Sequence, residues 1–358
     1  MHRPVVSVAL ATFNGARFLS EQLASLAAQS RLPDELVVCD DGSSDATLPL
    51  LAAFAGDAPF DVQIHRNQRR LGYRDNFLQA ANLCRGSLIA YCDQDDVWLP
   101  PKIERCVEAF NVSEPPSVVV HLYVVVDQAL NALGFEGPRF DRPGRVAPAD
   151  CPLFAAHNGS AMCFDRSLLA LVPTSNRPED VHANAPMSHD KWILFLAAVA
   201  SGVHVLPEQL MLYRQHGGNL AGAGSRDVAG RFHHVDSADH DHYLRLARLA
   251  DERAMVLERI ARAPTPSRGQ TYQAAARGRS YRKAAQALRR RAGLYVPGRS
   301  MRWRSGQFAR LGVGHSYAVT RHGGLGSRAM IKDFIVALAG PASLRLVGWA
   351  SGFIRRRR

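Results

Sequence analysis

Three short apolar runs in the first hundred residues each end in a cluster of polar or acidic side chains. The runs and the clusters that follow them are residues 5–11 before 12–15, 36–39 before 40–45, and 88–92 before 93–96. Runs of this length fit buried strands, and the segments 16–29 and 75–84 between them carry apolar residues at helical spacing. This alternation predicts an α/β fold with a Rossmann-like, mostly parallel sheet flanked by helices.

The polar clusters predict a binding site at one edge of this sheet. Asn14, Asp40, Asp41, Asp93 and Asp95 all fall just past the ends of predicted strands. In open α/β sheets, ligands bind outside the carboxyl ends of the strands. We therefore expect these amide and carboxylate groups to share one site.

The run Asp93-Gln94-Asp95-Asp96 is the strongest candidate for the centre of that site. Asp93 and Asp95 can both reach one hard divalent ion, and oxygen ligands favour Mg²⁺ or Mn²⁺. Such an ion takes much of its shell from water and substrate phosphates. The alternative is a solvated acidic turn or helix cap, which three acids alone would also fit.

The cluster at 40–45 allows two interpretations as well. Turn and capping chemistry explains Gly42, Ser44 and Asp45. It does not require two acids, Asp40 and Asp41, at the end of a buried strand. An acid in that place can accept a hydrogen bond from the imide N–H of uracil or thymine.

Taken together, the segments 5–15, 37–45 and 91–98 resemble the family-2 inverting glycosyltransferases of the GT-A fold, and the resemblance extends over roughly residues 4 to 220. It implies a nucleotide-diphosphate sugar as donor. The matching positions imply that Thr12, Phe13, Asn14 and Asp41 lie at the donor nucleotide, with Phe13 and Asp41 at the base. Asp93 and Asp95 then form the Asp-x-Asp motif of the family, and Asp95 is the expected direct metal ligand.

The segment 72–77 resembles the part of this family that runs beside the donor nucleotide. On that basis Arg74 is expected to meet a phosphate, and Asn76 to bind the donor or cap a helix. The alternative is a helix start with a solvated arginine.

The segment Ser188-His189-Asp190-Lys191-Trp192 begins an apolar helix. An acid at a helix start can simply favour the helix dipole. The family, however, keeps a catalytic acid here, and an acceptor hydroxyl must lose its proton as it attacks the anomeric carbon. A positioned carboxylate acts as the general base in such a step, so Asp190 is the expected base.

Two further segments carry residues that the resemblance places near the diphosphate or the acceptor. His216 is expected to contact the metal or a phosphate, and Arg214 a phosphate or the acceptor. Asn158, Gly159 and His189 fall on the acceptor side. A structural histidine and an ordinary loop are the alternatives. The glycine-rich segment 217–224 is expected to close over the donor.

Charge is distributed unevenly along the chain. Residues 1–258 hold 22 basic and 31 acidic residues, whereas residues 259–358 hold 22 basic residues and the single acid Asp333. We expect a GT-A domain at 1–225 and a helical, strongly basic region at 226–358. Residues 134–150, rich in Gly, Pro, Arg and Asp, are expected to form a loop.

The basic region predicts an anionic partner. It carries no recognised nucleic-acid motif and little aromatic interleaving, so nucleic acid is not expected. Residues 334–354 include Arg345 alone as a charged residue, are broken by Gly340-Pro341, and precede four arginines. This predicts a membrane-interface segment at 331–358 that rests on anionic lipid. The alternative is a solvated basic tail.

The resemblance to this family implies sugar transfer from dTDP-rhamnose or a UDP-hexose to a glycan or a polyprenyl-linked saccharide, in cell-surface polysaccharide synthesis. The sequences of the motifs resemble those of the rhamnosyltransferase-type members of this family. The six scattered cysteines are expected to be reduced and mostly buried, which favours the cytoplasm. The basic tail places the protein at the inner face of the plasma membrane in this interpretation. A nucleotidyltransferase and a non-catalytic nucleotide-sugar-binding protein on the same scaffold remain open at this point.

Overall fold

The computed structural model of the protein describes residues 3–136, 143–181, 183–217, 239–264, 266–313, 317 and 325–341. The chain divides into two compact units. The first comprises Met1–Arg177 and Met187–Ala223, and the second comprises Pro178–Pro186 and Gly224–Arg358. Each unit has a hydrophobic core of its own.

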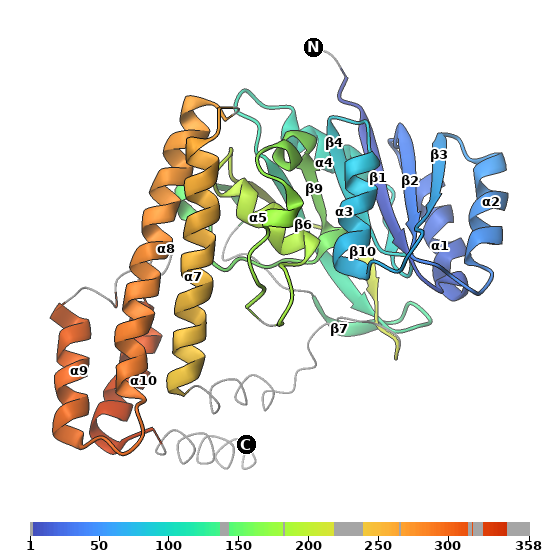
Figure 1. Cartoon of the computed structure of the whole chain (residues 1–358). Coiled ribbons are helices and arrows are strands. Elements are labelled where there is room, and N and C mark those ends of the chain that lie inside the picture. Colours follow the sequence, from blue (N-terminus) through green and yellow to red (C-terminus); the bar gives the residue numbers. More distant parts are fainter. Residues whose placement is uncertain are drawn as a thin grey trace. The chain divides into compact units, whose positions relative to one another are not determined.

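The first unit is built on one mixed sheet (Figure 1). Its strands are β1 (Val6–Thr12), β2 (Glu35–Asp40), β3 (Asp61–Arg66), β4 (Leu88–Cys92), β5 (Val97–Trp98), β6 (Val118–Val126), β7 (Ala132–Glu136), β8 (Gly144–Val146), β9 (Met162–Asp165) and β10 (Val203–Arg214). The main path runs β3-β2-β1-β4-β9-β6-β10-β5, with β7 beside β6 and β8 beside β10.

The two halves of the sheet differ in strand direction. Strands β3, β2, β1 and β4 run parallel to one another, as predicted. In the other half β9 is antiparallel to β4 and β6, whereas β10 runs parallel to β6. The parallel half places the ends of β1, β2 and β4 at one edge, because their registers align Thr12 with Asp40 and Leu10 with Cys92.

Helices cover both faces of this sheet, which accounts for the nearly unbroken apolar strands. They are α1 (Ala16–Ala27), α2 (Thr47–Asp57), α3 (Tyr73–Leu83), α4 (Lys102–Phe110) and α5 (His189–Ala197). Side chains alternate along a strand, so Val8 and Leu10 join the core with α1, α2 and α4. The opposite face meets α3, where Phe77 packs edge-on to Tyr91 at 5.4 Å, and α3 in turn contacts α5 (Figure 1).

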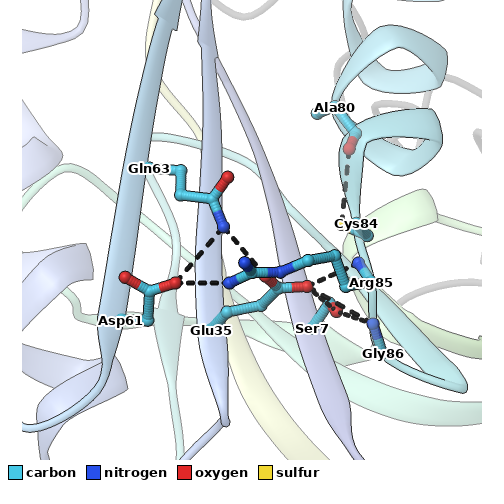
Figure 2. A network of polar contacts seen from close by, with 8 residues as sticks. All are labelled: Ser7, Glu35, Asp61, Gln63, Ala80, Cys84, Arg85 and Gly86. Atoms are coloured by element: carbon cyan, nitrogen blue, oxygen red, sulfur yellow. Dashed lines mark hydrogen bonds and ion pairs between the residues drawn. The ribbon is translucent and has the colours of Figure 1, made fainter.

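A buried polar network fixes the end of the sheet opposite the predicted site (Figure 2). Glu35 is 3% exposed and accepts hydrogen bonds from the Ser7 hydroxyl at 2.5 Å and from the Arg85 backbone N–H at 2.6 Å. Burial acts to raise the pKa of Glu35, but the hydrogen bonds from Ser7 and Arg85 outweigh it and lower that pKa. A Cβ at Gly86 would lie 2.5 Å from the Ser7 Oγ, so this network requires glycine there.

The second unit contains a long helical hairpin and two shorter helices. The helices are α7 (His240–Arg262), α8 (Arg268–Leu294), α9 (Met301–Val313) and α10 (Gly326–Ala339). Asp239 caps α7, and Ser267 caps α8 in a reciprocal capping box with Gln270. The segment 178–186 belongs to this unit because Arg245 of α7 donates to Glu179 at 2.8 Å.

Over the described residues, the C-terminal region contains the four helices α7 to α10. One prediction was wrong. The predicted loop at 134–150 contains β8, which pairs with β10. Strand β10 extends from Val203 to Arg214, and β6 and β5 pair with its second half. Most of the predicted interface segment 331–358 lies outside the described residues, which end at 341.

None of the helices in the described ranges combines the length and the apolar character needed to cross a membrane. All six cysteines are buried and free, as predicted.

Candidate active site

Five segments meet where β1, β2 and β4 end. They are the residues after β1, the turn at 40–45, the Asp93–Asp96 turn after β4, the short 3₁₀ turn η2 (Gly159–Ala161), and the first turn of α5. The end of β10 joins them through Arg214 and His216. Most of the residues singled out in the sequence therefore lie in one region of the first unit.

Asp93 is held in place by Ser160. The Asp93 backbone N–H donates to the Ser160 Oγ at 2.9 Å, and the Ser160 hydroxyl donates to Asp93 Oδ2 at 2.7 Å. Burial, together with the negative charges of Asp95 and Asp190, raises the pKa of Asp93 to about 7. Asp95 and Asp190 therefore both lie within electrostatic range of Asp93.

Asp95 and His216 form the pair best suited to a cation. His216 Nε2 lies 2.8 Å from Asp95 Oδ2, and the two side chains are 13% and 17% exposed. An imidazole nitrogen and a carboxylate oxygen fit Mn²⁺ or Mg²⁺. Over the described residues, no group of three or more His, Cys, Asp or Glu side chains is arranged to hold a metal. Most of the shell would have to come from water and substrate.

Arg214 lies behind this turn, and its side chain is 1% exposed. Its guanidinium donates to the Asp95 carbonyl at 2.8 Å, to the Gln128 carbonyl at 2.6 Å and to Glu21 at 2.6 Å. Its backbone N–H donates to Asp96 at 3.1 Å. We therefore assign Arg214 to holding the acidic turn rather than to contacting a phosphate or the acceptor.

Asp41 and Asn76 secure the segment before α3. Asp41 is 3% exposed and accepts hydrogen bonds from Asn67, Leu71 and Gly72 at 2.6 to 3.0 Å. Asn76 is 2% exposed and donates to the Cys39 carbonyl at 2.9 Å, while its oxygen accepts from Asn67 at 2.8 Å. The amide of Asn76 thus serves the fold, which leaves it poorly placed to bind a donor.

The residues after β1 make a more exposed surface. Thr12 is buried and donates to Asp40 at 3.0 Å. Phe13 is half-buried, exchanges hydrogen bonds with Gln94 through its backbone, and carries the Arg70 guanidinium 3.7 Å from its ring centroid. Asn14 is exposed at φ 48°, a left-handed conformation that asparagine tolerates.

Arg74 lies in the first turn of α3 and is half-buried. Its guanidinium lies 5.2 Å from the Tyr73 ring centroid.

Asp190 lies in the first turn of α5. Its Oδ1 accepts hydrogen bonds from the Ser188 hydroxyl and from the Lys191 N–H at 2.8 Å. Among the described residues, none donates to Oδ2. One oxygen therefore fixes the carboxylate, and the other is available to accept a proton.

His189 and Gly159 fit closely together beside Asp190. The His189 ring stacks on Phe77 at 4.0 Å and meets Tyr91 edge-on at 4.7 Å. Burial lowers the pKa of His189 to about 4, so its ring is neutral at pH 7. A Cβ on Gly159 would lie 2.4 Å from His189 Nε2. Asn158 caps η2 by accepting from the Ser160 N–H at 2.9 Å.

Sequence reasoning missed three residues that support this site. Ser160 ties η2 to Asp93, and Lys102 donates from a buried position to the Ser160 carbonyl. Arg177 bridges Asp75 of α3 and the Met187 carbonyl just before α5. A lysine after two prolines at a helix start reads as a solvated residue, and only the fold shows that Lys102 is 1% exposed.

Solved structures share this fold. A crystal structure of residues 1–349 of TarS from S. aureus, in complex with UDP-GlcNAc, superposes with a TM-score of 0.53 over 93% of this chain and 90% of that chain. The two sequences are 16% identical, so the likeness concerns the fold, which is that of the GT-A glycosyltransferases.

Sequence relatives carry the assignment further. Residues 7–148, less than half of the chain, match Glycosyl transferase family 2, and this match supports glycosyltransferase activity. An uncharacterized glycosyltransferase of Nostoc is 29% identical over 228 residues, which are 60% of this chain and 66% of the relative. Chondroitin synthase of Escherichia coli is 27% identical over 153 residues, which are 42% of this chain and 22% of that enzyme.

Proposed function

We propose that the protein transfers a sugar, with inversion, from a nucleotide-diphosphate donor to a glycan or a polyprenyl-linked saccharide. The observation that carries the proposal is the juxtaposition of Asp93, Asp95 and Asp190 at one edge of the sheet. The charges of Asp95 and Asp190 both act on Asp93, and Asp190 keeps one carboxylate oxygen uncommitted. The match to family 2 favours glycosyl transfer over nucleotidyl transfer or simple binding.

Asp190 is the proposed general base. Its Oδ2 takes the proton of the acceptor hydroxyl as that oxygen attacks the anomeric carbon, while Ser188 and the Lys191 N–H hold Oδ1. Neutral His189, Asn158 and Gly159 lie beside it and are proposed to line the acceptor side. The acceptor oxygen that loses its proton to this base attacks the anomeric carbon from the face opposite the leaving diphosphate, which accounts for inversion.

Asp95 and His216 are the proposed residues that would hold Mg²⁺ or Mn²⁺, with Asp93 beside them. When bound, such an ion would neutralise the charge that develops on the leaving nucleoside diphosphate. Arg214 contributes indirectly, because it fixes the backbone of the Asp95 turn. Arg74 is proposed to meet a donor phosphate.

The donor nucleotide is proposed to lie over Phe13 and Asn14, with Thr12 beneath and Asp41 at the edge of the base. A pyrimidine base, as in dTDP-rhamnose or a UDP-hexose, suits a carboxylate acceptor. UDP-GlcNAc, present in the TarS complex, belongs to this group of donors and supports a uridine nucleotide as one candidate. Asp41 already accepts three hydrogen bonds from the protein, so it would act through its remaining lone pairs.

We further propose that the protein works in cell-surface polysaccharide synthesis, in the cytoplasm at the inner face of the plasma membrane. Six buried, free cysteines support a reducing compartment. The strongly basic region after residue 258 supports an anionic surface as partner.

Calorimetric titration with a panel of nucleotide sugars tests the donor half of the proposal. We expect one pyrimidine-nucleotide sugar to bind, and to bind at least about tenfold more weakly when Mn²⁺ is removed or Asp95 is changed to Ala. Asp57→Ala, an exposed acid at the end of α2, is the control and should bind as wild type does. The metal assignment would be refuted if Asp95→Ala bound the nucleotide sugar as tightly as wild type in Mn²⁺, or if a chelator left the binding by wild type unchanged.

A further inference from the structure

Helix α8 of the second unit carries a row of exposed basic side chains. Arg268, Arg279, Lys283 and Arg290 are all exposed. At 100° per residue, the four fall within about 60° of one another around the helix axis, and at 1.5 Å per residue they extend over about 33 Å. We call these four residues the α8 cationic stripe.

The charges of the stripe are not compensated by neighbouring acids. None of the four forms an ion pair with another described residue. The neighbouring cations of α8 do: Arg282 pairs with Glu258 at 2.9 Å, and Arg289 pairs with Asp251. The acids of α7 that face α8 are therefore already engaged on the side next to the stripe.

The rest of the region adds no negative charge. Residues 259–358 contain one acid, Asp333, which is fully buried and accepts a hydrogen bond from Arg291 at 2.9 Å. Positive charge that is exposed, aligned and uncompensated attracts an anionic partner.

The form of the stripe fits a flat surface better than a strand of nucleic acid. Tyr272 is 66% exposed and lies within the same sector of the helix. One aromatic ring among four cations can rest at a lipid interface, but it does not supply the row of rings on which successive bases stack.

Exposed apolar side chains in the same unit also favour a lipid surface as the partner. Met330, Ile331, Phe334 and Leu338 of α10 are 41 to 61% exposed and occupy one side of that helix. Basic and apolar side chains together are the composition of surfaces that rest on anionic lipid.

From these observations we propose that the α8 cationic stripe docks the protein on an anionic lipid surface. The inference rests on the proposed function in one respect, since a lipid-linked acceptor would give this docking its purpose. It places the main electrostatic contact on α8 rather than on residues 331–358.

The test is sedimentation of the full chain with lipid vesicles, without any nucleotide sugar. We expect binding to vesicles that contain one-third phosphatidylglycerol and not to pure phosphatidylcholine, and weakening as salt rises. Each lipid-facing cation is worth roughly fivefold in binding. The triple variant Arg279→Gln, Lys283→Gln, Arg290→Gln should therefore bind about a hundredfold more weakly.

The control removes the same charge elsewhere. Arg3, Arg166 and Arg262 are exposed and lie outside α8, so changing all three to Gln should leave most of the binding intact. Equal weakening in both triple variants would overturn the proposal. So would tighter binding of wild type to single-stranded RNA or to soluble polyphosphate than to vesicles at the same salt. The sedimentation experiment does not involve sugar transfer, so the docking proposal can fail while the proposed function stands, and the reverse.

Discussion

Arg214 shows how a residue type can suggest one role and its surroundings another. An arginine after a strand, near a histidine, resembles a phosphate ligand in sequence. In the fold its guanidinium donates to two backbone carbonyls and Glu21, and it lies 4.5 Å from the Phe18 ring centroid. A buried cation with this many partners is costly to release. Its contribution to the site is therefore the shape of the Asp95 turn.

Lys102 is the second buried cation behind the acidic turn. Its ammonium donates to the Ser160 carbonyl and lies 3.4 Å from the Trp98 ring centroid. Burial lowers its pKa to about 8. Because Ser160 in turn holds Asp93, we expect Lys102 to position that carboxylate without touching the substrate.

Lys102→Met should raise the KM for the donor several-fold and change kcat less, since the loss falls on the placement of Asp93. Ser160→Ala should do the same. Both substitutions act through the same contact, in which Lys102 holds Ser160 and Ser160 holds Asp93. The KM of the double variant should therefore be no higher than that of the more impaired single variant. Steady-state kinetics of the four proteins measure this. Multiplicative effects on KM would show that Lys102 acts by another route.

His189 predicts a pH dependence of stability. Its pKa is about 4 in the folded protein and near 6.5 when unfolded, because burial disfavours the charged ring. The unfolded state therefore binds more protons between pH 6.5 and 4, and stability falls as pH is lowered through this window. Between pH 7 and pH 4.5, the free energy of unfolding of wild type should fall by about 2 kcal/mol more than that of His189→Gln. Urea unfolding at pH 7 and pH 4.5 tests this, and an equal loss in both proteins would contradict it.

At the scale of elements, the parallel half of the sheet could be predicted and the mixed half could not. Residues 88–92 form β4 as expected, since an apolar run between turn signals leaves few alternatives. Strand β8 consists of Gly144, Arg145 and Val146, and its own residues favour no strand. It forms because β10 offers an edge to pair with. Pairing of this kind depends on the assembled sheet and leaves little trace in local sequence.

The candidate site divides in the same way. Local sequence pattern predicts where the strands end, and Asp93 and Asp95 lie at the predicted edge of the sheet. The contact between η2 and α5 joins segments thirty residues apart, so neither Gly159 nor Ser160 could be assigned a partner from sequence alone. The close fit of Gly159 against His189 depends on how α5 packs.

Gly159→Ala should disturb this contact between elements. The added methyl would lie 2.4 Å from His189 Nε2 and 3.5 Å from the Asp190 Cβ, so the start of α5 must move. We expect kcat to fall about tenfold or more, because small misplacements of a reacting group are costly. Gly56→Ala in α2, where a methyl meets nothing within 4 Å, is the control and should keep full activity. Unchanged kcat in Gly159→Ala would show that the fit is not needed.

At the scale of the whole molecule, the proposed catalytic residues and most of the basic residues belong to different units. The first unit carries the acidic turn and the proposed base, and the second carries most of the basic residues. The segment 178–186 belongs to the second unit, yet it lies in sequence between Arg177 and the start of α5. It is clamped to α7 by Arg245, Arg248 and Arg253. The sequence does not predict that this segment belongs to the second unit, because the segment is short and has no hydrophobic periodicity.

The central claim is that Asp190 acts as the base in sugar transfer, separately from the residues that hold the donor. Asp190→Asn keeps the shape and the contacts of Oδ1 but cannot take a proton. We predict that it binds the nucleotide sugar as tightly as wild type and forms product at least about a hundredfold more slowly. Turnover within tenfold of wild type would contradict the claim.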